Sequence, residues 1–149
     1  MKIVNYIIAT AFGAGYAPLA PGTAGSILCL LIVYFCSPVP LLAYLLVLLL
    51  LFFLGVYSST WVEKDLGHDP SIVVIDEVLG MGISLLFLPR NFWLFFIAFL
   101  LFRVFDILKP PPINLSQKLP AGWGIMIDDV IAGFYALIGV HIIRYFAGI

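Results

Sequence analysis

Carboxylates occupy an unusual place in this 149-residue chain, because they interrupt segments that are otherwise strongly apolar. Asp76-Glu77 and Asp128-Asp129 are adjacent pairs, and Asp106 stands alone near the end of another apolar segment. A charged side chain at the centre of a membrane helix costs on the order of 2.5 to 3.5 kcal/mol, so such groups usually face a polar cavity and have partners. Three acidic positions in three apolar segments therefore predict one shared polar centre.

A divalent cation would relieve the repulsion within such a cluster. Mg²⁺ takes one or two carboxylates together with water and substrate phosphate, and it fits this set better than zinc. Zinc requires cysteine or histidine in ligand spacing, which the two cysteines and two histidines do not supply. The candidate Mg²⁺ ligands are Asp76, Glu77, Asp106, Asp128 and Asp129. An alternative is that the acids simply favour positive helix starts, but this does not explain Asp106 near a helix end.

Cations accompany the acids. Arg103, Asp106 and Lys109 recur at i, i+3 and i+6, which predicts a polar stripe in which Asp106 lies between two cations that bind phosphate. The alternative is that Arg103 and Lys109 only extend their charged ends toward the membrane surface. His68, in a polar stretch, suits either acid–base chemistry or a plain surface-loop position.

The segment 21–26, Pro-Gly-Thr-Ala-Gly-Ser, is typical of a loop that opens a helix. Thr23 or Ser26 is available as the N-cap, and the glycines would let backbone N–H groups approach an anion. Thr23 and Ser26 are therefore candidate phosphate-binding residues. The signal is weak alone, because small residues also serve helix packing in membranes.

Composition sets the architecture that must position these groups. Hydrophobic residues make up 64% of the chain and charged residues only 10%, against roughly 25% charged in an ordinary soluble domain. We therefore expect a single membrane-embedded domain over residues 1–149, built as an all-α polytopic bundle. Its five expected helices are 23–36, 41–62, 71–88, 92–108 and 125–146. The apolar run before them is shorter than the roughly 20 residues of a spanning helix, which predicts a short interfacial or re-entrant segment.

Alternating these five helices across a bilayer brings all eight acidic residues to one face. Most basic residues fall on the same face, so the positive-inside rule places that face in the cytoplasm, with the N-terminus inside. The formal net charge of -1 argues against a nucleic-acid partner.

Four strings together resemble one known family. They are PGTAGS at 21–26, IDEVLG at 75–80 (preceded by Asp69-Pro70), FRVFDILKP at 102–110 and GWGIMIDDVIAG at 122–133. Each string is modest evidence, but four in the same order resemble the phosphatidylglycerophosphatase A family specifically.

The resemblance implies a Mg²⁺-dependent phosphomonoesterase that converts the membrane lipid phosphatidylglycerophosphate to phosphatidylglycerol and inorganic phosphate. Asp76, Glu77, Asp106 and Asp129 would then serve the reaction, and water would attack directly. Arg103 and Lys109 would stabilise charge on the phosphoryl group. The alternative function is a small ion or proton transporter, which would need carboxylates along a path across the membrane. The expected placement of all acids near one face does not favour that function.

Overall fold

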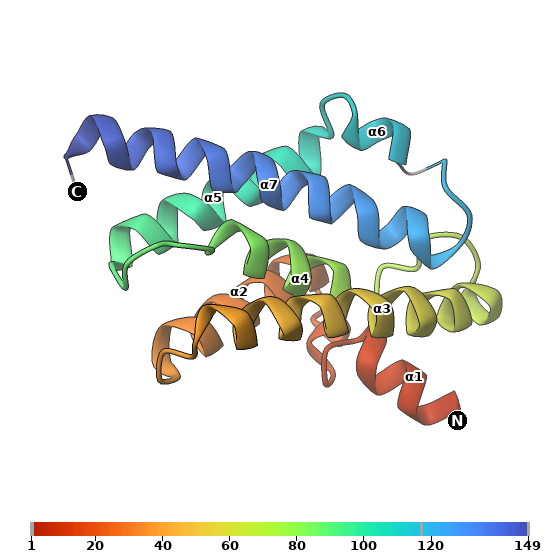
Figure 1. Ribbon diagram of the computed structural model, residues 1–149. Helices are drawn as coiled ribbons and strands as arrows, with labels where there is room; N and C mark the ends of the chain where they lie inside the picture. Colours follow the sequence, from red (N-terminus) through yellow and green to blue (C-terminus); the bar gives the residue numbers. More distant parts are fainter. Residues whose placement is uncertain (1, 117, 149) are drawn as a thin grey trace.

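The computed structural model describes residues 2–116 and 118–148, and this part of the chain forms helices joined by turns and loops, without strands (Figure 1). The predicted all-α class is confirmed. The elements in chain order are α1 (Lys2–Ala9), the 3₁₀ helix η1 (Ala14–Tyr16), α2 (Pro21–Phe35), α3 (Leu41–Leu66), α4 (Ile75–Ser84), α5 (Phe92–Leu108), α6 (Ile113–Ser116) and α7 (Gly122–Ala147).

The short helix α4 forms the centre of the bundle. It packs against α7, α2, α3 and α5, and every residue from Leu79 to Ser84 is buried. Helices α3, α4, α5 and α7 run alternately between the two ends of the molecule (Figure 1). The N-termini of α4 and α7 and the C-termini of α3 and α5 therefore lie toward the same end.

Helix α2 begins two residues before its predicted start, and the predicted N-cap is wrong. Pro21 occupies the first turn, where its fixed φ angle suits a helix start, and Ala20 takes the N-cap position without a side-chain hydrogen bond. Thr23 lies inside the first turn, and the Ser26 hydroxyl donates to the Gly22 carbonyl oxygen at 2.9 Å. Both hydroxyls are thus part of the helix rather than caps before it.

The other boundaries follow contacts that a local pattern does not reveal. Helix α3 continues to Leu66, and the residue that follows it is Gly67, whose φ of 96° favours glycine. Helix α4 begins at Ile75 rather than at residue 71, because the Val74 N–H donates to the Ala9 carbonyl oxygen at 2.8 Å. It ends at Ser84, four residues before its predicted end. Helix α5 matches its prediction, and α7 begins three residues early at Gly122.

Two glycines bring α4 and α7 into backbone contact. A Cβ atom at Gly133 would lie 2.5 Å from the Gly80 carbonyl oxygen. This close approach sets the spacing between the helices that carry Asp76 and Asp129.

We therefore expect Gly133→Ala to destabilise the fold by about 1 to 3 kcal/mol, because the added methyl group meets backbone that cannot rotate away. Gly139→Ala is the matched control on α7: its Cβ atom would meet only Leu101 side-chain atoms, the nearest at 3.1 Å, and alanine favours a helix over glycine. Thermal unfolding in detergent measures both variants. Equal midpoints would show that the Gly80–Gly133 contact is not tight.

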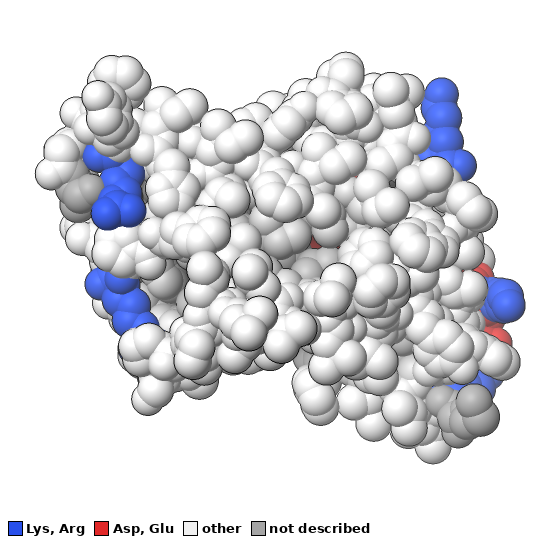
Figure 2. Space-filling model, in the orientation of Figure 1, with Lys and Arg blue, Asp and Glu red and all other residues white. Residues whose placement is uncertain are grey.

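Helices α3 and α7 are long and apolar enough to cross a membrane, by length and composition. Much of the α3 surface is exposed and apolar, with Leu42 70% and Leu50 59% exposed. Lys and Arg side chains appear at the two ends of the face in Figure 2, with an almost uncharged zone between them. This distribution matches a protein that contacts lipid along its middle.

Candidate active site

The N-terminal part of α4 and the second turn of α7 together carry three carboxylates. One oxygen each from Asp76, Glu77 and Asp129 can be chosen so that all three lie within 4.8 Å of one another. Asp76 and Asp129 are 9% and 2% exposed, and Glu77 is half-buried. The predicted convergence of acids from separate helices is therefore present for these two helices.

Each of these three acids has an oxygen without a hydrogen-bond partner among the described residues. They are Asp76 Oδ1, Glu77 Oε2 and Asp129 Oδ2, all shielded from solvent. A buried polar atom without a partner is costly, and three beside one another are rare in a purely structural cluster. The arrangement is what a site for a cation and its hydration water requires.

Arg103 and Asp106 form an ion pair beside this cluster, on α5. The Arg103 Nη1 atom lies 2.9 Å from Asp106 Oδ2, and the two side chains are 17% and 13% exposed. The same Nη1 atom donates to the Ser26 hydroxyl on α2 at 3.5 Å, while the Arg103 Nε atom is buried and has no partner within residues 2–116 and 118–148. Arg103 thus joins α5 to α2 and keeps one donor uncommitted.

Lys109 does not share Asp106 with Arg103 as predicted from the i, i+3, i+6 spacing. Its Nζ atom donates to Asp128 Oδ2 on α7 at 2.7 Å. The reason is local: Lys109 follows the last residue of α5 with a φ of 44°, so its side chain leaves the helical stripe. Each cation therefore has its own carboxylate.

Adjacent Asp128 and Asp129 have different environments, as their helical spacing predicts. Asp128 pairs with Lys109 and also accepts from the Asp129 N–H at 3.0 Å, whereas Asp129 turns toward the α4 acids. Of the five predicted ligands, Asp76, Glu77 and Asp129 form the cluster, whereas Asp106 and Asp128 are paired with cations, and Asp106 also lies beside Asp129.

Gly22 is a site residue whose role was not evident from the sequence. A Cβ atom at this position would overlap the Glu77 carboxylate and approach Arg103 Nη1 to 3.3 Å. The first turn of α2, with half-buried Thr23, therefore lies directly beside the carboxylates and the guanidinium. Backbone N–H groups at a helix start favour anions, so this turn suits a carboxylate or a phosphate. In the sequence, only the glycine-rich segment 21–26 indicated that this turn lies at the site.

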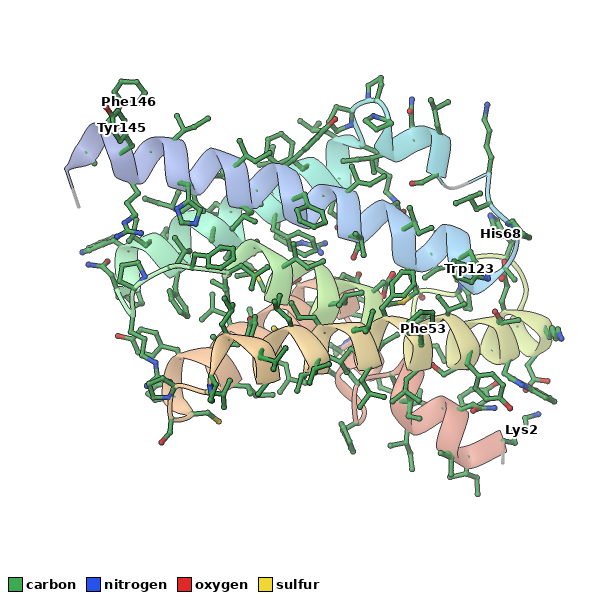
Figure 3. The ribbon with its side chains drawn as sticks, in the orientation of Figure 1. Lys2, Phe53, His68, Trp123, Tyr145 and Phe146 are labelled. Carbon is green, nitrogen blue, oxygen red and sulfur yellow. The ribbon has the colours of Figure 1, made fainter. Side chains whose placement is uncertain are left out.

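The two histidines lie outside this arrangement. His68 is an exposed loop residue whose Nδ1 atom is 2.6 Å from Glu63 Oε1, and this hydrogen bond raises the pKa of His68. His141 contacts the Leu86 carbonyl oxygen with Nε2 at 3.0 Å. Figure 3 places His68 and Lys2 at one end of the molecule, and Tyr145 and Phe146 at the other.

Tyr135 is a second residue whose contact the sequence did not reveal. Its hydroxyl donates from α7 to the Pro111 carbonyl oxygen at 3.0 Å. The contact fastens the proline-rich turn that directly follows Lys109.

Together, the carboxylates, the two cations and the α2 helix start define a class: an all-α protein with an acidic, anion-compatible centre enclosed by apolar helices. A sequence model of the phosphatidylglycerophosphatase A family matches residues 7–144. The chain belongs to that phosphatase family, and it is an enzyme.

Bacterial relatives match the chain over nearly its whole length. A phosphatidylglycerophosphatase A of Escherichia coli is 40% identical over 138 residues, covering 89% of this chain and 80% of the relative. One of Haemophilus influenzae is 42% identical over 144 residues, covering 94% and 88%. A Bacteroides thetaiotaomicron protein carrying the name "Putative phosphatidylinositol-3-phosphatase" is 39% identical over 150 residues, covering 95% and 94%. No solved structure gives a significant match.

Proposed function

We propose that this enzyme hydrolyses the phosphomonoester of phosphatidylglycerophosphate, releasing phosphatidylglycerol and inorganic phosphate. The observation that carries the proposal is the cluster of Asp76, Glu77 and Asp129, with three unpartnered buried oxygens beside Arg103. The family and two of its named relatives supply the lipid.

The residues of the cluster fit a Mg²⁺ ion. Its donors are carboxylate oxygens alone, one from each residue within 4.8 Å of the others, and each residue has an oxygen without a partner among the described residues, which suits a hard cation that also keeps water. Asp76, Glu77 and Asp129 would hold the ion. When bound, Mg²⁺ would neutralise charge on the phosphate and lower the pKa of a bound water.

The cations and the α2 helix start have the complementary task of holding phosphate. Arg103 has an uncommitted Nε–H, and Lys109 can present donors while paired with Asp128. Asp106 and Asp128 orient these two side chains, as partners in charge-assisted hydrogen bonds do. The Ser26 hydroxyl accepts from Arg103 on the same side, and Thr23 belongs to the first turn of the same helix.

The reaction itself is a direct attack of water on phosphorus. A new P–O bond forms from the water, the bond between phosphorus and the glycerol oxygen breaks, and the glycerol oxygen ends protonated. A carboxylate of the cluster accepts one proton of the attacking water, and this proton is then passed to the leaving glycerol oxygen. Arg103 and Lys109 stabilise the charge that develops on the phosphoryl oxygens.

We also propose a multi-pass placement in a bacterial inner membrane. Five helices, α2, α3, α4, α5 and α7, would lie within the bilayer, with the acidic end and the N-terminus on the cytoplasmic side. The headgroup would then meet the carboxylates at the membrane face while the acyl chains stay in lipid. Arg90 and Arg144, rather than acids, lie on the segments at the opposite end, so no carboxylate path for a transporter crosses the bundle.

Phosphate release from a headgroup panel tests the substrate. We expect phosphatidylglycerophosphate to give a higher kcat/KM than phosphatidylinositol 3-phosphate or phosphatidic acid in the same micelles. Preference for phosphatidylinositol 3-phosphate would overturn the headgroup assignment and leave the phosphatase chemistry in place.

A further inference from the structure

An outward-facing apolar groove lies beside α1 and η1. It has a volume of about 630 Å³, and its lining includes the apolar or aromatic side chains of Ile3, Ile7, Phe12 and Tyr16 together with Lys2. Phe12 is 88% exposed and has a φ of 57°, in the turn that reverses the chain after α1. A conformation disfavoured for a bulky residue thus presents an aromatic side chain outward.

This groove is connected to the acid cluster through backbone contacts. The Ala9 carbonyl oxygen at the end of α1 accepts from Val74 N–H, and Gly15 of η1 packs directly on the Ile72 carbonyl oxygen. Val74 lies two residues before Asp76 in the chain. The wall of the groove and the start of the acid-bearing helix are therefore fastened to each other.

The groove also lies beside a helix whose outer surface is apolar. Helix α1 packs against α3 (Figure 1), and Leu50 and Phe53 of α3 are 59% and 55% exposed. In a bilayer, such a surface meets hydrocarbon chains rather than water. Among the lining residues, the Lys2 ammonium lies 2.8 Å from Asp65 and is therefore already paired.

From this placement we propose that the α1–η1 groove binds an acyl chain of the lipid substrate while its phosphate lies at the carboxylates. The inference rests on the proposed function and adds a subsite to it. The groove would recognise a hydrocarbon chain and orient the headgroup toward α4. Binding energy from a remote part of a substrate can position its reacting group in this way.

Chain-length dependence tests the proposal. Dioleoyl and dihexanoyl phosphatidylglycerophosphate are compared in the same micelles, as the ratio of their kcat/KM values. Ile7→Trp fills the groove, so this long-to-short ratio is expected to fall about tenfold, the low end for a blocked hydrophobic pocket. Leu42→Trp, at an exposed apolar position of α3 away from the groove, is the matched control and is expected to keep the parent's ratio.

Photo-crosslinking of the parent enzyme supplies a test that needs no variant. Phosphatidylglycerophosphate with a diazirine on its acyl chain is expected to label peptides within residues 2–16, and excess dioleoyl substrate is expected to compete. Labelling that the substrate does not displace would mean that bulk lipid fills the groove, which overturns the proposal. An unchanged ratio in folded Ile7→Trp would overturn it as well. If the parent hydrolyses neither lipid, the proposed function fails. Competition of the crosslink by dioleoyl substrate still shows whether the groove binds the acyl chain of this lipid.

Discussion

Asp129→Asn is expected to lower kcat by at least about 100-fold, because it removes a negative oxygen from the three-carboxylate cluster. Asp129 is almost fully buried, and its Oδ2 atom has no partner among the described residues. The asparagine amide would also bring N–H donors into a space that suits a cation. Phosphate release at saturating substrate and Mg²⁺ measures the effect.

Two comparisons separate this loss from misfolding. Without Mg²⁺, Asp129→Asn is expected to unfold at the same temperature as the parent or higher, because it removes a buried charge that lacks a partner. Asp65→Asn makes the same chemical change at a more exposed carboxylate that pairs with Lys2, and it is expected to retain most of the parent's kcat. Full activity of Asp129→Asn would remove this residue from the catalytic centre.

Arg103→Met is expected to lower kcat/KM by about 10³-fold, within the range of an arginine that stabilises a transferred phosphoryl group. The same change leaves Asp106 largely buried without its partner, so we also expect a stability loss of about 3 kcal/mol. Kinetics of phosphate release and thermal unfolding measure the two effects separately.

A double variant distinguishes binding of phosphate from stabilisation of Asp106. Arg103→Met with Asp106→Asn removes both charges, and we expect it to regain stability without regaining activity. Arg90→Met is the matched control, since Arg90 is exposed at the opposite end of the molecule. If the double variant regained activity together with stability, Arg103 would have only a structural role.

The position of the acids along their helices was predictable from the sequence, because helix geometry is local. Prolines and glycines mark the ends of the apolar segments, so Asp76 and Asp129 were predicted near helix starts. Because α3, α4, α5 and α7 alternate in direction, these two starts lie at the same end of the molecule. Adjacent helical residues point about 100° apart, and Asp128 and Asp129 accordingly differ in their partners, whereas Asp76 and Glu77 both join the same cluster.

The pairing of charges was not predictable from spacing, because it depends on contacts between distant segments. Lys109 would join Asp106 on an ideal helix, but its φ of 44° at the end of α5 turns it toward Asp128. Helix α4 begins later than predicted because Val74 pairs with Ala9, 65 residues earlier. Gly22 contacts Glu77 for a similar reason: the packing of α2 on α4 decides it.

The most direct test of the central claim is phosphate release from phosphatidylglycerophosphate by the purified enzyme, with Mg²⁺, with EDTA, and with Mg²⁺ restored. The carboxylate cluster predicts rapid release with Mg²⁺, loss of release with EDTA and recovery when the ion returns. Release that is equally fast in EDTA would contradict a metal-assisted centre at Asp76, Glu77 and Asp129. Absence of release under all three conditions would contradict the proposed reaction.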